Sequence, residues 1–262
     1  MAANRTLEDL LRLAARLVPG LNGVVAAHAP ATHGLAHVCP APGTGSNNRA
    51  ALEALLAHWS NAFPEAGRAY WSSRCWGILT WQPLYLCVIG VHASQAVLSL
   101  EHIAQPIAGG WTSEVQVADH PPAQGDPAAL IVRAAQEIST CCTQMYDELM
   151  PVIRLNPAAA RCTQADVVLA ALLAARQARP EWSDTDVATL AGQWLAALDL
   201  EGHGGLFPFT RSDGSHALAL ERQTCCYHYR RRDGEPCSTC PRLAKQERIV
   251  RLNRERDAAA AA

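Results

Sequence analysis

Four cysteines near the C-terminus are the residues best suited to chemistry. Cys225 and Cys226 are adjacent, and after a gap of ten residues Cys237 and Cys240 form a C-x-x-C. A C-x-x-C places two thiolates on one tight turn, where both can reach the same metal centre. The gap contains an Asp-Gly dipeptide and a proline, which are turn-forming residues and can bring the two halves together. We therefore expect these four cysteines to bind one metal centre.

The number of ligands leaves two kinds of centre open. Four thiolates suit a tetrahedral zinc ion or a two-iron cluster equally well. Structural zinc ligands are usually two to four residues apart, and two neighbouring residues can chelate one ion only with strain. A two-iron cluster is a larger target, so the adjacent pair favours a cluster over zinc, with unliganded thiols as a third reading.

The spacing CC-x10-C-x2-C resembles the C-terminal signature of the ferric-siderophore reductases typified by FhuF. The flanking residues are similar too: Arg222 and Thr224 precede the pair, Tyr227 and Arg230 follow it, and Pro241 follows the last cysteine. A looser likeness lies in RCWGILTWQPLYL, which resembles the middle of the hydroxamate-type siderophore reductases. The specific motif is short, and the looser likeness extends the resemblance over about half of the chain.

The resemblance implies a cofactor and an activity. The cofactor would be a [2Fe–2S] cluster on Cys225, Cys226, Cys237 and Cys240. The activity would be one-electron reduction of an Fe(III)-siderophore of hydroxamate type in the cytoplasm, which releases Fe(II), with a ferredoxin or a flavin-dependent reductase as electron donor. No motif in the first two hundred residues identifies the substrate pocket, so the catalytic residues are unassigned. The alternatives are a zinc-stabilised binding protein without enzymatic activity and an iron–sulfur redox sensor.

The remaining cysteines and the tryptophans have a simpler interpretation. Cys141 and Cys142 form a second adjacent pair, but no C-x-x-C accompanies them and they fall inside an expected helix. We expect them to be small buried residues, as we do for the other four: Cys39, Cys75, Cys87 and Cys162. The same applies to a set of tryptophans that we expect in the core: Trp71, Trp76, Trp81 and Trp111.

Charge is distributed unevenly along the chain. The net charge is −2, which is too small to suggest nucleic acid as a partner of the whole surface. Residues 222–256 contain ten basic and four acidic residues, so a basic tail follows an acidic body. A helix is expected at residues 244–256. With Arg230–Arg232 it could dock an acidic electron donor, or it could simply pack through its apolar face.

The pattern of apolar residues predicts mostly helices. They are expected at residues 6–18, 49–63, from about 65 into the apolar stretch, and at 128–150, 163–178 and 184–199. Thr163 and Ser183 are candidate N-caps. Strands are expected at 96–100 and 113–118, and FTRSDGSHALALER reads as a hairpin. The fold class is therefore α+β and predominantly helical, with a small β-hairpin leading into a C-terminal iron–sulfur cluster segment.

Turn-forming residues suggest where the chain divides. The stretch HPPAQGDP is the best linker. We expect an N-terminal α+β region at 1–120, a helical region at 121–205, and a C-terminal [2Fe–2S]-binding segment with a basic helix at 206–262.

One stretch invites comparison with a membrane span. Between Arg74 and Glu101 the chain carries no Asp, Glu, Lys or Arg. Polar residues interrupt the stretch, and Pro83 is expected to break or kink a helix there. We expect a buried core element and no membrane span, which leaves a peripheral position at the inner membrane open. The N-terminal residues predict an amphipathic helix and not a secretory signal, so we expect the cytoplasm, where thiols stay reduced.

Overall fold

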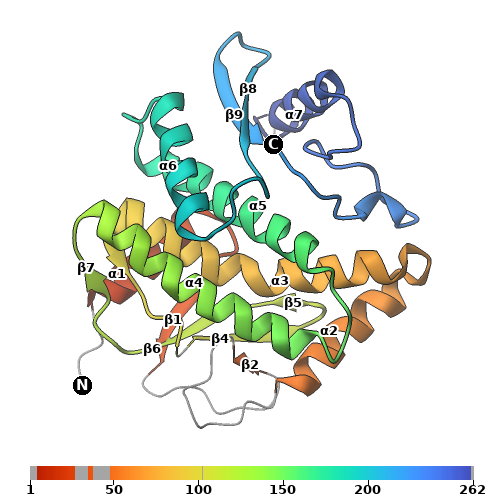
Figure 1. Cartoon of the computed structure of the whole chain (residues 1–262), viewed down its shortest axis with the longest axis horizontal. Helices are drawn as coiled ribbons and strands as arrows, with labels where there is room; N and C mark the ends of the chain where they lie inside the picture. Colours follow the sequence, from red (N-terminus) through yellow and green to blue (C-terminus); the bar gives the residue numbers. More distant parts are fainter. Residues whose placement is uncertain (1–4, 27–34, 38–47, 102, 261–262) are drawn as a thin grey trace.

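The computed structural model describes residues 5–26, 35–37, 48–101 and 103–260. Helices dominate this part of the chain, and small sheets accompany them (Figure 1). The expected class, α+β and predominantly helical, is confirmed. The α-helices are α1 (Arg5–Leu17), α2 (Arg49–Ala62), α3 (Gly67–Ile89), α4 (Pro127–Leu149), α5 (Pro157–Ala175), α6 (Asp184–Ala197) and α7 (Lys245–Ala260).

The helix starts follow from their caps. Ser183 accepts a hydrogen bond from the backbone N–H of Asp186 and completes a capping box, as expected for α6. The expected cap at Thr163 is wrong, because α5 begins six residues earlier with Asn156 as its N-cap and Pro157 in the first turn. Thr163 lies inside α5, and its hydroxyl donates to the carbonyl of Ala159 at 3.0 Å.

The main sheet has five strands and is small. Its order is β1-β6-β4-β2, with β5 paired to β4; β1 and β6 are parallel, and the β4 pairings are antiparallel. The strands are β1 (Gly23–Ala26), β2 (Leu35–His37), β4 (Ile103–Ala108), β5 (Trp111–Thr112) and β6 (Val115–Ala118). Of the two expected strands, 113–118 corresponds to β6. The other shortens to β3 (Ala96–Val97), which pairs with β7 (Ala123–Gln124). The sequence missed β4 because Pro106 interrupts its short apolar run.

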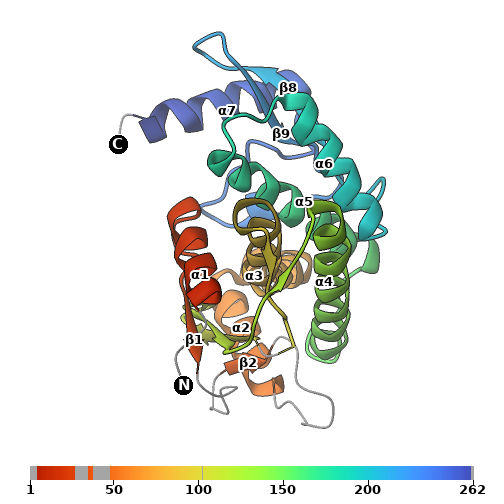
Figure 2. The ribbon, with the colours of Figure 1, turned by 90° about the vertical axis from the view of Figure 1, so that its left-hand side faces the viewer.

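Helix α3 is the centre of the packing. It contacts α5 most extensively and also packs against α1, α2 and α4. Figure 2 shows α1, α3 and α4 side by side beneath the C-terminal elements. Tyr70 and Trp76 are 1% exposed, and Leu84 and Leu86 are fully buried. The charge-free stretch after Arg74 is therefore a buried core element, as expected.

The expectation of a break at Pro83 is wrong. Helix α3 runs through Pro83 to Ile89. Proline has no N–H to donate to the carbonyl four residues earlier, which is that of Leu79. The side chain of Gln105 on β4 donates to this carbonyl at 2.8 Å and is itself fully buried. A side chain from the sheet thus replaces the missing intrahelical hydrogen bond, so the helix continues.

One described helical stretch, Pro157–Ala178, is long and apolar enough to cross a membrane. Half of it is buried inside the protein, where α5 packs against α3 and α6. The core helix of a soluble protein has the same composition, so this stretch is weak evidence for a span. The absence of a membrane span stays a prediction.

The C-terminal part begins with the expected hairpin. Strands β8 (Leu206–Thr210) and β9 (His216–Leu220) pair antiparallel, and Gly214 in the turn has φ +82°. In Figure 1 the hairpin and α7 lie together at the top of the molecule, above α5. One continuous core extends from Leu7 to Leu200, and residues of β8 and β9 pack against it. The division into three regions stays a prediction.

The buried side chain of His92 makes the stability of the fold depend on pH. It is 4% exposed, its Nε2 accepts a hydrogen bond from the indole of Trp194 at 2.8 Å, and burial lowers its pKa to about 4. Below the usual value near 6.5 the unfolded chain binds a proton that the folded protein does not, so stability falls as pH falls towards 4. The slope from this group is at most ~1.4 kcal/mol per pH unit.

We expect His92→Gln, which keeps a hydrogen-bond acceptor, to lose this part of the pH dependence. The thermal midpoints of both proteins should be measured at pH 7 and pH 5. The wild type should lose more stability than the variant between these values. Equal losses would show that His92 does not titrate in this way.

Candidate metal centre

The backbone turns directly after the two adjacent cysteines. Tyr227, the next residue, has φ +57°, a left-handed conformation that residues other than glycine rarely adopt. Its N–H lies 3.4 Å from Sγ of Cys225 and donates to it. The chain therefore turns sharply at the pair, which the sequence required for both thiols to reach one centre.

The gap between the cysteine pairs is folded tightly. A Cβ on Gly234 would lie 2.1 Å from the carbonyl oxygen of His228, so only glycine fits this approach. Its N–H donates to the carbonyl of Arg231 at 2.9 Å. The C-x-x-C forms its own turn, in which the N–H of Cys240 donates to the carbonyl of Cys237 at 3.0 Å.

The fold brings the four thiols together as two pairs. The side chain of Cys225 lies beside that of Cys240, and the side chain of Cys226 lies beside that of Cys237. Among the described residues, no group of three or more His, Cys, Asp or Glu side chains is arranged to hold a single metal ion. Two pairs of thiols fit a two-iron cluster with four cysteine ligands better than they fit one zinc ion.

A buried ion pair supports the second thiol pair. Arg222 donates from Nε to Oδ2 of Asp166 on α5 at 2.7 Å, and its Nη1 lies 3.6 Å from Sγ of Cys237. The two charged side chains are 15% and 6% exposed. Burial raises the pKa of Asp166 to about 6, and the guanidinium of Arg222 opposes this rise.

The same neighbours prepare one thiolate. The neighbouring thiol of Cys237, followed by the charge of Arg222, lowers the pKa of Cys226 against the opposing effect of burial. The same neighbourhood raises the pKa of Cys237. Metal ligation requires deprotonated thiols, so Cys226 is the ligand candidate that ionises most readily of the two.

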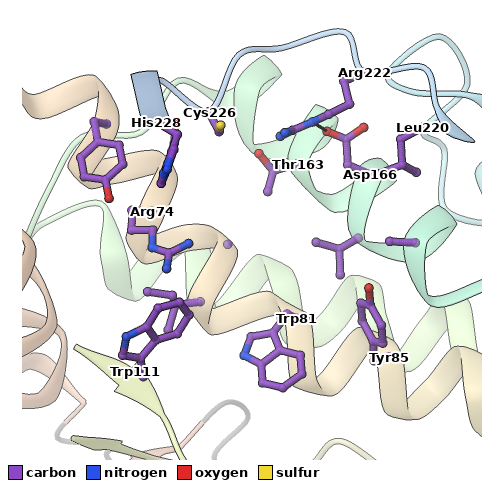
Figure 3. A pocket seen from close by; sticks show the side chains of 16 residues that line it. Arg74, Trp81, Tyr85, Trp111, Thr163, Asp166, Leu220, Arg222, Cys226 and His228 are labelled. Atoms are coloured by element: carbon purple, nitrogen blue, oxygen red, sulfur yellow. Dashed lines mark hydrogen bonds and ion pairs between the residues drawn. The ribbon is translucent and has the colours of Figure 1, made fainter. Parts of the chain in front are cut away.

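Cys226 also forms part of the wall of a cavity of about 490 Å³ (Figure 3). This volume is typical of small-molecule sites. Helix α3 provides one wall, α5 the opposite one, and the C-terminal segment closes the side that carries the thiol. The lining residues are Tyr70, Ser73, Arg74, Gly77, Ile78, Trp81 and Tyr85 of α3, Trp111 of β5, Thr163, Asp166, Val167 and Ala170 of α5, and Leu220, Arg222, Cys226 and His228.

Arg74 has an unusual environment in this cavity. Its guanidinium carbon lies 4.1 Å from the ring centre of Trp111 and 4.5 Å from that of Trp59. Burial lowers the pKa of Arg74, and no carboxylate of the described residues forms an ion pair with it. A desolvated cation–π contact contributes about 2 kcal/mol, which offsets only part of the cost of several kcal/mol for burying a charge. An anionic partner for Arg74 would therefore be stabilising.

Comparison with known families bears directly on this segment. Residues 222–242 match the family model of the FhuF 2Fe-2S C-terminal domain. Residues 222–242, referred to as the FhuF-type domain, are thus similar to this 2Fe-2S domain. The match confirms the resemblance predicted from the sequence, and it supports a [2Fe–2S] cluster as the cofactor. No solved structure matches the chain. The assignment of the cluster to the four named cysteines stays a prediction.

The arginines of the FhuF-type domain have different partners. The guanidinium of Arg222 reaches the sulfur of Cys237, a ligand candidate. Arg231 pairs with Asp233 at 2.6 Å, and Arg232 donates to the carbonyl of Ala62 at 3.0 Å. These contacts anchor the loop between the cysteine pairs to itself and to the end of α2.

Two arginines fix helix α7 to the hairpin and to the loop between the cysteine pairs. Arg248, 8% exposed, pairs with Glu221 at 3.0 Å, and its guanidinium lies over the ring of Phe207. Arg251 donates to the carbonyl of Pro236, one residue before a ligand candidate, at 3.0 Å. These two arginines join the hairpin, the ligand loop and α7. The contacts are made by charged side chains and not by the apolar face, where Val250 is 58% exposed. Docking of an electron donor by other basic residues stays a prediction.

Outside the FhuF-type domain the cysteine expectations hold where they can be checked. The described cysteines there are all buried: Cys75, Cys87, Cys141, Cys142 and Cys162. Cys39 lies outside the described residues.

The tryptophan expectation holds only in part. Trp76 is buried in the core, but Trp111 is 48% exposed and lines the cavity, as does Trp81. The sequence carried one signal for this cavity. Tyr70, Arg74, Trp81 and Tyr85 are four, seven and four residues apart, which places them on one face of a helix.

Substitution of the cysteines tests the ligand assignment. Changing any of Cys225, Cys226, Cys237 and Cys240 to Ser should remove or destabilise the cluster, because a hydroxyl is a harder and less acidic ligand than a thiol. Iron and sulfide content and the visible spectrum of the purified protein measure this. Cys141→Ser and Cys142→Ser are matched controls and should retain iron. Equal loss of iron in the controls would mean that the ligand assignment is wrong.

Substitution of Arg222 or Asp166 tests the role of the ion pair. Removing the positive charge in Arg222→Gln should lower the reduction potential of the cluster, because the reduced form carries more negative charge. Removing the negative charge in Asp166→Asn should raise it. Spectroelectrochemical titration of variants that retain their full iron content measures both shifts in reduction potential. Shifts of the same sign would contradict an electrostatic role.

Proposed function

We propose that this protein reduces an Fe(III)-siderophore by one electron and thereby releases Fe(II). The observation that carries the proposal is that Cys226, a predicted cluster ligand, lines a cavity of small-molecule size. The FhuF-type domain supports a ferric-siderophore-reductase-like iron–sulfur protein. The further details, a hydroxamate chelate as substrate and the cytoplasm as location, belong to the proposal.

The chemistry suits a one-electron carrier. Siderophores bind Fe(III) through hard oxygen donors and bind Fe(II) far more weakly, so one added electron loosens the metal. The [2Fe–2S] cluster supplies one electron at a time when it is bound. The protein's own residues bring the chelate close: α3 and α5 form the cavity, and the Arg222–Asp166 pair holds the cysteine segment beside it.

The cavity is suited to a chelate with an organic periphery. Trp81 and Tyr85 provide aromatic surface, and Ile78 and Val167 provide aliphatic surface. Such walls bind an apolar scaffold and exclude water from it. The polar groups are gathered near the thiol, where Arg74 and Arg222 come from opposite sides (Figure 3).

The electron donor is part of the same proposal. A ferredoxin or a flavin-dependent reductase would reach the cluster from outside, since Cys225 and Cys237 are only partly buried. Among the basic residues nearby, Arg230 and Arg254 are exposed and could meet an acidic donor.

We expect the reduced protein to pass its electron to a ferric trihydroxamate in a single turnover. The protein would be reduced anaerobically, freed of reductant and mixed with the chelate. The visible spectrum should return to that of the oxidised form, and an Fe(II)-specific chelator should trap one Fe(II) per cluster. A spectrum that stays reduced, with no Fe(II) trapped, would contradict the proposed function.

A further inference from the structure

We propose that Arg74 binds the substrate: the cavity beside Cys226 takes an oxygen-donor ferric chelate of zero or negative net charge, and the iron-coordinating oxygens accept hydrogen bonds from Arg74. This inference rests on the proposed function. It adds the residue that recognises the chelate and the chemistry that is recognised.

The charges of the cavity point to Arg74. Two guanidiniums line it, but they are in different states. Arg222 is neutralised by Asp166 through a 2.7 Å hydrogen bond. Arg74 has no carboxylate partner among the described residues, and its Nε is buried without a hydrogen-bond acceptor. A buried cation of this kind is stabilised by an anion that enters from solution.

The geometry around Arg74 leaves its N–H groups available for a ligand. The rings of Trp59 and Trp111 lie against the guanidinium, at 4.5 and 4.1 Å from ring centre to guanidinium carbon. The two ring planes are inclined at 77° to each other, so the guanidinium can stack flat on at most one of them. Neither ring accepts a conventional hydrogen bond, and Nε of Arg74 has no acceptor. In Figure 3 Arg74 lies between His228 and Trp111, on the side of the cavity that carries Cys226.

The ligand chemistry follows from this arrangement. Oxygens that coordinate Fe(III) are deprotonated and carry negative charge, so they are strong acceptors for a guanidinium. Contact with Arg74 would orient the iron-binding side of the chelate towards the thiol wall. The organic periphery would then lie against Trp81 and Tyr85. A chelate with a net positive charge would be repelled by the unpaired guanidinium.

The test uses a redox-inert probe. The neutral gallium(III) complex of a trihydroxamate has the same charge as the ferric complex and takes up no electron. Calorimetric titration of the cluster-loaded protein with this complex therefore measures binding alone. Arg74→Gln should bind it roughly 10- to 100-fold more weakly than the wild type, the loss of a hydrogen bond to a charged donor. Arg74→Lys keeps the charge but not the planar fork, and should lie between the two.

Controls make the result specific. Arg68 lies on α3 outside the cavity, so Arg68→Gln should bind the probe as the wild type does. Iron content and thermal midpoint show whether each variant is folded and loaded. If Arg74→Gln does not fold, the Arg74→Lys protein decides, because its affinity should still fall below that of the wild type.

Three outcomes would overturn the inference. The wild type could fail to bind the gallium complex, Arg74 variants could bind it as tightly as the wild type, or Arg74→Gln could lower the reduction potential without weakening binding, which would mean that Arg74 serves the cluster. Failure of the proposed function looks different. In that case the gallium complex binds in an Arg74-dependent way, but the reduced protein transfers no electron to the ferric complex.

Discussion

The buried ion pair between Arg222 and Asp166 is the contact on which the arrangement of the site depends. Arg222 lies three residues before the first ligand candidate, and Asp166 lies in the middle of α5, so their hydrogen bond fixes the C-terminal segment to the helical body. Removing one partner of such a pair leaves an uncompensated buried charge, which typically costs about 3–5 kcal/mol. The same guanidinium reaches Cys237, so one residue both anchors the segment and sets the charge beside a ligand.

The cavity wall depends on the continuation of α3 past Pro83. Arg74, Trp81 and Tyr85 lie along one face of this helix, and Pro83 lies between the last two. A kink there would turn Tyr85 away from Arg74. The hydrogen bond from Gln105 to the carbonyl of Leu79 supplies what the proline removes. A buried amide on the sheet thereby keeps the cavity wall continuous.

The sequence predicted what is local and missed what is assembled. The cysteine motif, the hairpin and the capping box at Ser183 are each encoded within a few residues, and each was found. The cavity draws on residues near 74, 111, 166 and 222, which only tertiary packing brings together. Strand β4 was missed because Pro106 lies within its short apolar run. The course of α3 past Pro83 was missed because the side chain that replaces the lost hydrogen bond, Gln105, comes from a distant strand.

Of the two guanidiniums that line the cavity beside the thiols, only that of Arg222 is paired with a carboxylate of the described residues. Arg222 is paired with Asp166, so it contributes a hydrogen bond to Cys237 while adding little net charge to the interior. Arg74 has no such partner and lies where a bound chelate would bring its oxygens towards Cys226. Both an electron on the cluster and the oxygens of a chelate place negative charge in this space, and like charges repel strongly in a buried site. An unpaired guanidinium in the same cavity reduces that repulsion. A cation that destabilises the empty cavity can therefore be favourable once the cavity is filled.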